Sequence, residues 1–283
     1  MTTLRFIFGD QLSDSIATLS DLDKANDIIL MTEVMSEATS VAHHKKKIVF
    51  LFSAMRHFAQ ALQNDACHVV YTRLDDPHNS GCFFSELERV CRQYAITKII
   101  VTAASEYRVL QDIHTWQARL NIPVSIREDT RFLCRHDEFA TWANARKQLR
   151  MEYFYREMRI KYQILMEDSQ PVGGQWNYDA SNRKPPQNSL SIPAPYQIKP
   201  DTITRDVMKL VAERFPHHFG DIEPFHLAVT RDDALAALAL FIQERLARFG
   251  DYQDAMLENE PWMFHSHLSF YTHCTSRCEV GFI

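Results

Sequence analysis

The stretch Met151–Arg183, MEYFYREMRIKYQILMEDSQPVGGQWNYDASNR, divides the chain into two differently organised parts. Before it, short apolar runs typical of strands alternate with segments of helical periodicity. After it, only helical periodicity continues. Within the stretch, apolar residues recur every three or four positions from Met151 to Met166, which predicts a helix. Pro171 and the Gly173–Gly174 pair favour a loop after that helix.

Working back toward the N-terminus, five apolar runs predict strands, and the segments between them predict helices. The strands are expected at residues 4–8, 28–31, 68–71, 98–101 and 124–126, and the helices at 46–62, 83–94 and 109–120. Apolar strands that alternate with helices indicate a parallel sheet covered on both faces. We therefore expect an α/β fold with a doubly wound, five-stranded, Rossmann-like sheet in the order 3-2-1-4-5, forming a domain of residues 1–131.

The rest of the chain predicts helices joined by one long loop. Residues 132–202 are expected to hold two connecting helices, at 136–145 and 151–166, followed by a proline-bearing interdomain loop. A loop of this length is usually functional or disordered. Residues 203–283 are expected to begin an all-helical domain that is incomplete, with helices at 203–215 and 231–249.

Composition limits the classes of function. The net charge of −5 provides no overall field that would attract nucleic acid, so any DNA contact must use a local patch. Six scattered cysteines without disulfide-like spacing favour a reducing cytoplasm. No signal peptide and no apolar run of about 20 residues is present, so we expect a cytoplasmic protein without a membrane partner. The missing G-x-G-x-x-G and G-x-x-x-x-G-K-[ST] patterns argue against a dinucleotide or P-loop site.

The predicted sheet places a ligand crevice beyond strands one and four, where the strand order reverses. Polar residues follow three of the strands: Gly9, Asp10 and Gln11 after the first, Glu33 and Glu37 after the second, and Glu106 after the fourth. Carboxylates and an amide can hydrogen-bond a neutral heterocycle and a sugar-like chain, and they repel a phosphate. Ordinary solvated turns are an equal alternative. The run His43–Lys47, HHKKK, is interpreted as a solvated helix start or as a cation near the crevice mouth.

A second candidate surface is basic and aromatic. Its cations surround the 151–166 helix and are Arg146, Lys147, Arg150, Arg156, Arg159 and, after the loop, Arg183. They are the best candidates for contacts to DNA phosphates, and a solvated helical face is the alternative. The aromatic face of the same helix either packs one domain onto the next or meets a planar, anionic partner. Cys274 and Cys278 with the neighbouring histidines match no zinc or iron–sulfur spacing, so no metal is expected.

Four motifs in the chain resemble one family. They are LRFIFGDQLS at 4–13, HHKKKIVFLFSAMRHF at 43–58, MEYFYREMR at 151–159, and P-x-G-G-x-W-N-x-D-x-x-N-R at 171–183. The sequence resembles the bacterial photolyase-related proteins, the group of iron–sulfur cryptochromes and prokaryotic (6-4) photolyases, from Leu4 to about Tyr271. The resemblance implies light-dependent DNA repair or photoreception, in which a flavin repairs a pyrimidine photoproduct and an antenna pigment supplies it with energy.

The resemblance also implies which residues hold the antenna pigment, 6,7-dimethyl-8-ribityllumazine. The matching positions are Gly9, Asp10, Gln11, Glu33, Met35, Glu37 and Leu51. Glu106 matches more loosely, because Ala103-Ala104 stands where the family has an acid–proline turn.

The segment FHSHLSFY at 264–271 resembles the start of the family's flavin site, with His265, Ser266 and Ser269 near the flavin phosphates. After Tyr271 the family pattern is lost, and we expect a truncated or frameshifted chain. FAD and the [4Fe-4S] cluster of full-length members are then expected to be absent, and so are catalytic residues. We expect a chain that is inactive as a DNA photolyase, retains the antenna domain, and binds DNA weakly if at all. The alternative is a non-enzymatic lumazine-binding protein or an inactive remnant.

Overall fold

The computed structural model describes residues 2–144, 146–186 and 190–271, which form two compact units. The first unit contains the described residues up to Asp129, then Gln197–Ala237, and residues 268–271. The second contains Thr130–Tyr196 and Leu238–His267. The domain limits suggested by the sequence, at residues 131 and 202, stay predictions.

A five-stranded parallel sheet forms the centre of the first unit. Its strands are β1 Thr2–Phe6, β2 Ile28–Thr32, β3 Val69–Thr72, β4 Ile96–Thr102 and β5 Val124–Arg127. They lie in the order β3-β2-β1-β4-β5, so β1 pairs with both β2 and β4. The predicted α/β class, strand number and strand order are confirmed. The order reverses between β1 and β4, which is where ligands bind in sheets of this type.

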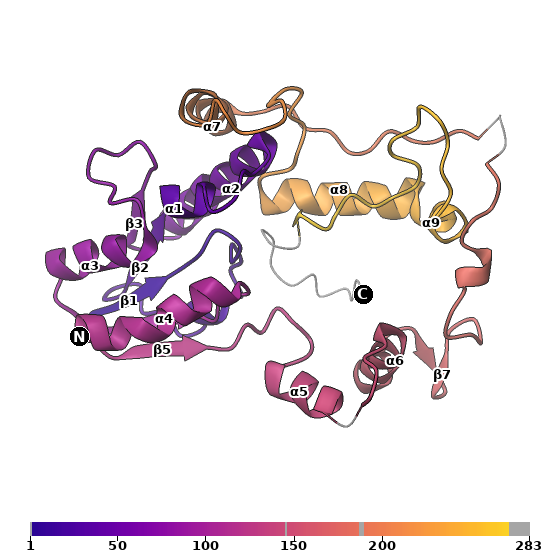
Figure 1. The fold of residues 1–283 in the computed structure, drawn as a ribbon, viewed down its shortest axis with the longest axis horizontal. Coiled ribbons are helices and arrows are strands. Elements are labelled where there is room, and N and C mark those ends of the chain that lie inside the picture. The colour runs from indigo at the N-terminus through magenta and orange to yellow at the C-terminus, as the bar shows by residue number, and fades with distance from the viewer. Residues whose placement is uncertain (1, 145, 187–189, 272–283) are drawn as a thin grey trace. The chain divides into compact units, whose positions relative to one another are not determined.

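Helices cover both faces of this sheet (Figure 1). Helix α2 (Lys45–Asn64) covers one face, while α3 (Phe83–Gln93) and α4 (Tyr107–Leu120) cover the other. Alternate β1 residues point to the α3 and α4 side, because successive side chains of a strand face opposite ways. Phe6 packs there against the fully buried ring of Trp116, with ring centroids 5.3 Å apart. The result is a doubly wound layer.

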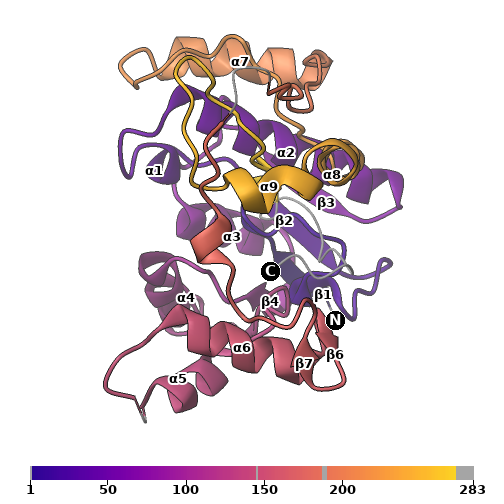
Figure 2. The same ribbon diagram turned by 90° about the vertical axis from the view of Figure 1, so that its right-hand side faces the viewer.

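A further helix, α7 (Thr202–Arg214), lies beside α2, as Figure 1 and Figure 2 both show. Helix α2 is therefore covered on two sides. Phe50 and Ala54 of α2 are buried in this arrangement. Asp201 begins α7 by accepting a hydrogen bond from the backbone N–H of Thr204 at 2.8 Å, a typical N-cap.

Shorter elements complete the description. The first unit also holds a 3-10 turn η1 (Ala17–Leu19) and the short helix α1 (Met35–Ala38). The second unit holds the helices α5 (His136–Asn144), α6 (Met151–Tyr162) and α9 (Leu246–Tyr252). It also holds the hairpin of β6 (Met166–Glu167) and β7 (Gln170–Pro171) and a 3-10 turn η2 (Asp179–Ser181). Helix α8 (Arg231–Glu244) contributes to both units. Among the described helices, none combines the length and apolarity that a membrane crossing requires.

Two predicted helices end earlier than the periodicity indicated. The helix expected at 151–166 ends at Tyr162, because Gln163 adopts the left-handed conformation with φ of 54°. The helix expected at 231–249 is interrupted at Arg245, whose side chain is only 3 % exposed. Its guanidinium donates hydrogen bonds to the carbonyl oxygens of His265 (2.8 Å) and Pro193. A buried cation must be satisfied by such acceptors, and periodicity does not reveal that requirement.

A buried ion pair joins β2 to α2 in the first unit. Glu33 is fully buried, and its carboxylate accepts hydrogen bonds from Arg56 Nε (2.7 Å) and Nη2 (3.0 Å). The hydroxyl of Tyr71 and the backbone N–H of Leu74 donate to the same carboxylate, at 2.7 and 2.8 Å. Burial acts to lower the pKa of Arg56, but its bonds to Glu33 raise that pKa above the usual value. Burial and then the Glu33 charge raise the pKa of Tyr71.

We predict that Glu33→Gln destabilises the first unit strongly, because it leaves the Arg56 charge buried without a partner. Loss of one member of a buried pair typically lowers the free energy of unfolding by about 3–5 kcal/mol. Urea denaturation followed by circular dichroism measures the change. The control is Glu88→Gln, which breaks an exposed pair with Arg92 on α3 and should cost under about 0.5 kcal/mol. Equal effects of the two substitutions would contradict the importance of the buried pair.

Candidate ligand-binding site

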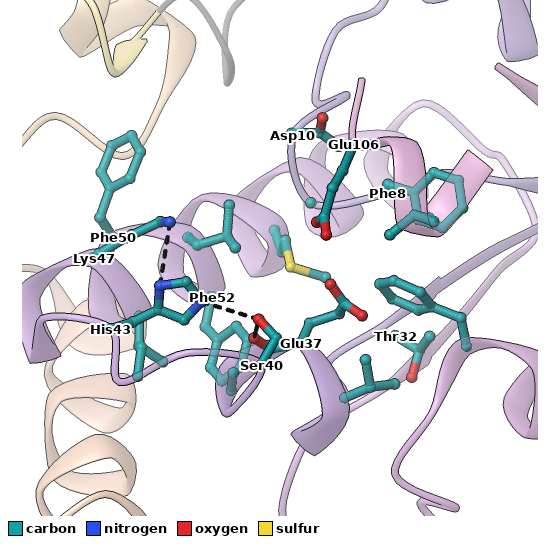
Figure 3. Close-up of a pocket in the computed structure, with 18 of the residues that line it drawn as sticks. Phe8, Asp10, Thr32, Glu37, Ser40, His43, Lys47, Phe50, Phe52 and Glu106 are labelled. Atoms are coloured by element: carbon teal, nitrogen blue, oxygen red, sulfur yellow. Dashed lines mark hydrogen bonds between the residues drawn. The ribbon is translucent and has the colours of Figure 1, made fainter. Parts of the chain in front are cut away.

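A cavity of about 460 Å³ lies in the first unit, beyond the carboxyl ends of β1, β2 and β4 (Figure 3). Its walls come from the segments that follow these strands and from α2. The lining residues include Phe8, Gly9 and Asp10 after β1, Thr32 at the end of β2, Val34 and Glu37 after β2, Ala104 and Glu106 after β4, and Ile48, Leu51, Phe52 and Met55 on α2. The cavity therefore lies at the reversal point of the strand order.

Close packing between the β1 turn and α2 depends on a glycine. A Cβ atom at Gly9 would lie 2.9 Å from Met55 Sδ and 3.3 Å from Leu51 Cγ. The first distance is shorter than real contacts allow, so any side chain at position 9 would push α2 away or fill the cavity. Gly9 thus keeps the apolar floor, formed by Leu51 and Met55, next to the turn that carries Asp10.

Five of the predicted pigment residues line the cavity, namely Gly9, Asp10, Glu37, Leu51 and Glu106. The other three, Gln11, Glu33 and Met35, are not among the lining residues. Gln11 is fully buried, and its amide donates to the carbonyl oxygens of Thr102 and Ala103, each at 3.2 Å. Glu33 is held by Arg56. Met35 is half-buried at the start of α1.

Two acidic side chains at the rim are joined by an arginine that does not itself line the cavity. Arg108 donates to both carboxylate oxygens of Glu37, at 3.1 and 2.7 Å, and to Glu106 Oε1 at 2.9 Å. Figure 3 shows the carboxylates of Glu37 and Glu106 turned toward the cavity. The hydrogen bonds from Arg108 to Glu37 raise the pKa of Arg108 and outweigh the opposite effect of its burial.

The opposite rim carries one cation, Lys47, and the uncharged side chains of His43 and Ser40. Lys47 Nζ lies 3.3 Å from His43 Nδ1, and His43 Nε2 lies 3.5 Å from Ser40 Oγ. Burial and the Lys47 charge lower the pKa of His43, so its ring is neutral at pH 7. His44 instead begins α2, because its Nδ1 accepts from the backbone N–H of Lys46 at 3.0 Å. A cation near the crevice mouth, one of the two interpretations of the 43–47 run, matches the position of Lys47.

Sequence reasoning missed one wall of the cavity. Phe270 lines it, although it lies far from the other lining residues in the chain. Its ring centroid is 5.8 Å from that of Phe50, and the next residue, Tyr271, is 6.2 Å from Phe50. The hydroxyl of Tyr271 accepts a hydrogen bond from the buried backbone N–H of Ala228. No sequence signal connects residue 270 with the strand ends, because the contact arises only from the tertiary fold.

The predicted DNA-contacting cations lie in the second unit, and most of them have partners. Arg159 is 5 % exposed and donates to the carbonyl oxygens of Ile164 and Leu165, so it shapes the end of α6. Arg156 pairs with Glu152, and its guanidinium lies 5.5 Å from the ring of Trp176.

The remaining four predicted cations are on the surface. Arg146 pairs with Glu157 at 2.5 Å, and Arg183 is 3.7 Å from Asp254. Lys147 and Arg150 are exposed and form no ion pair with a carboxylate of the described residues, so they are the members of the set best placed to contact phosphate.

The predicted flavin residues His265, Ser266 and Ser269 stay a prediction. His265 and Ser266 belong to the second unit, and Ser269 belongs to the first. Within the described ranges, no group of three or more His, Cys, Asp or Glu side chains is arranged to hold a metal ion. Cys274 and Cys278 lie outside the described residues.

Comparison with known proteins agrees with this architecture. The family described as deoxyribodipyrimidine photo-lyase-related protein matches residues 5–227, and the chain belongs to this family. A protein of Agrobacterium fabrum named "(6-4) photolyase" is 49 % identical over 274 residues, covering 97 % of this chain and 54 % of that protein. An uncharacterized protein of Acanthamoeba polyphaga mimivirus is 22 % identical over 199 residues, covering 68 % of this chain and 99 % of the viral protein. The chain thus spans about half the length of the Agrobacterium relative.

We predict that Leu51→Trp fills the cavity floor and prevents ligand binding while the first unit stays folded. Overpacking typically costs about 1–3 kcal/mol, which a core of this size tolerates. Ligand titration and thermal unfolding measure the two effects separately. Gln60→Trp, on the exposed side of α2, is the matched control and should leave binding unchanged. A Leu51→Trp variant that binds as tightly as the unmodified chain would exclude this cavity as the site.

Proposed function

We propose that the cavity binds a neutral ribityl-lumazine, 6,7-dimethyl-8-ribityllumazine or a close analogue, as the antenna pigment of a light-dependent DNA repair protein of this family. The observation that supports the proposal best is the cavity beyond β1 and β4, with its apolar floor and carboxylate rim. Its volume of about 460 Å³ falls within the roughly 300–1,000 Å³ typical of small-ligand pockets.

The two kinds of lining suit the two parts of such a pigment. Phe8, Phe52, Leu51 and Met55 offer an apolar surface to a planar ring. Glu37 and Glu106 are acceptors for the hydroxyl groups of a ribityl chain, and Lys47 is a donor for ring carbonyls. A phosphate would meet the acidic rim unfavourably, which disfavours a nucleotide.

The pigment supplies the light absorption, and the protein supplies binding and orientation. Gly9 and Leu51 set the shape of the floor, while Phe270 and Phe50 form an apolar wall. A fixed environment keeps an absorbing ring in one orientation, which directional transfer of excitation energy requires. We further propose that the chain serves in DNA repair, because it is 49 % identical to 54 % of the relative named "(6-4) photolyase".

Titration of the purified chain with 6,7-dimethyl-8-ribityllumazine tests the proposal. We expect saturable binding with one pigment per chain and a change in pigment fluorescence. Riboflavin 5′-phosphate, which carries a phosphate, is expected to bind more weakly. Fluorescence that rises linearly without saturation, or tighter binding of the phosphate-bearing flavin, would refute a neutral-pigment site.

A second candidate function is a pigment-binding protein without enzymatic activity. The cavity of the first unit supports it, because pigment binding requires only the residues that line this cavity. Absorption of the purified protein separates the enzyme, the pigment carrier and an inactive remnant. A flavin spectrum supports the enzyme, a lumazine band alone supports the pigment carrier, and a colourless protein that takes up no lumazine supports an inactive remnant.

We also propose that the second unit contacts DNA. The ring of Trp176 is 5.5 and 5.3 Å from the guanidinium groups of Arg156 and Arg159, but Arg159 is buried, so the exposed cations Lys147 and Arg150 are the ones that suit contact with a nucleic acid. The overall charge of −5 opposes approach, so binding is expected to be weak and independent of sequence.

We predict that Lys147→Ala combined with Arg150→Ala reduces the salt dependence of duplex binding. Each phosphate contact contributes about −0.9 to the slope of log affinity against log salt, so the slope should flatten by up to about two units. Fluorescence anisotropy at several salt concentrations provides the slope. The matched control removes two exposed cations of the first unit, Lys24 and Arg92, and should not change it. An unchanged slope in the 147/150 variant would place DNA contacts elsewhere.

A further inference from the structure

We infer that Arg108 is a positioning residue of the pigment site. Its guanidinium holds Glu37 and Glu106 so that the unused acceptor sites of these carboxylates face hydroxyl groups of the ligand. This inference rests on the proposed function and names a residue that acts through others. Arg108 does not line the cavity, but both of its partners do.

The geometry provides the first argument. Glu37 belongs to α1, after β2, and Glu106 immediately precedes α4, after β4. Arg108, in the first turn of α4, donates Nη1 and Nη2 to the two Glu37 oxygens and Nε to Glu106. One planar guanidinium therefore connects the segments that follow two strands on either side of β1. A lysine could not reproduce this fork, because its ammonium lacks a fixed directional pattern.

The acceptor capacity of the carboxylates provides the second argument. A carboxylate has about four lone-pair sites, and Arg108 occupies two on Glu37 and one on Glu106. The other sites stay available to a donor in the cavity, toward which both carboxylates point (Figure 3). Because charge-assisted bidentate bonds are directional, Arg108 fixes the orientation of these sites before a ligand arrives.

Charge provides the third argument. Two carboxylates that share one guanidinium lie close enough to repel each other when the guanidinium is removed. Without Arg108, we expect both flexible side chains to turn outward into water. Glu106 is the freer of the two, with 57 % of its side chain exposed against 26 % for Glu37. A ligand would then have to reorder them, and that entropy cost weakens binding.

Lumazine titration of the full chain and a set of variants tests the inference. We expect Arg108→Ala to weaken binding by roughly three- to tenfold, and Arg108→Lys to recover only part of that loss. Glu37→Gln alone should also weaken binding. The double variant Arg108→Ala/Glu37→Gln should lose much less than the product of the two single effects, because Arg108 acts through Glu37. Arg92→Ala, which breaks an exposed pair on α3, is the control and should bind normally.

The outcomes separate this inference from the proposed function. If the unmodified chain binds no lumazine, the proposed function fails and this inference fails with it. If the unmodified chain binds lumazine and Arg108→Ala binds equally well, only the role of Arg108 is refuted. Multiplicative effects in the double variant would refute action through Glu37. A second readout is binding of 6,7-dimethyllumazine, which lacks the ribityl hydroxyls: the same fractional loss for both ligands would show a general structural defect and overturn the inference.

Discussion

The architecture of the first unit depends on the ion pair between Glu33 and Arg56. Two buried charges require complete hydrogen bonding, and the Glu33 carboxylate obtains it from Arg56, Tyr71 and Leu74. These donors come from α2, from β3 and from the segment after β3. Helix α2 is thereby fixed in position and rotation against the sheet, and α2 carries the floor of the cavity. A shift of α2 would change Leu51 and Met55 together, so the interior charge pair and the ligand site are parts of one arrangement.

The sheet could be predicted from the sequence because its physical cause is local. Each strand is an apolar run, each crossover helix has its own periodicity, and the handedness of crossovers leaves few topologies. The strand order followed from these rules. The interruption at Arg245 could not be predicted, since it depends on a side chain that bonds to distant carbonyl groups, and the end of α6 at Gln163 depends on a left-handed backbone conformation that periodicity does not reveal. The partners of Arg245, Pro193 and His265, lie 52 and 20 residues away in the chain.

The residues that line the candidate site could be predicted from the sequence only in part. Glycine and acidic residues directly after strands indicate a crevice, and Gly9, Asp10, Glu37, Leu51 and Glu106 do line the cavity. The same rule also selected Gln11 and Glu33, whose polar atoms are engaged within the protein. Residue type and position after a strand do not distinguish a side chain that faces a ligand from one that satisfies the interior. Arg108 is the opposite case, because its position after a strand did not select it. Its two partners, Glu37 and Glu106, come together only in the folded chain.

The wall formed by Phe270 has a consequence for the order in which the protein is made. A ribosome releases the strands and α2 early, yet the residue that closes the cavity comes from position 270. The α/β layer can form during synthesis, because its contacts lie within residues synthesised first. The cavity then remains open on one side until the late segment packs against Phe50. A small molecule can therefore meet all the walls of the cavity only in a chain that has been synthesised past residue 270.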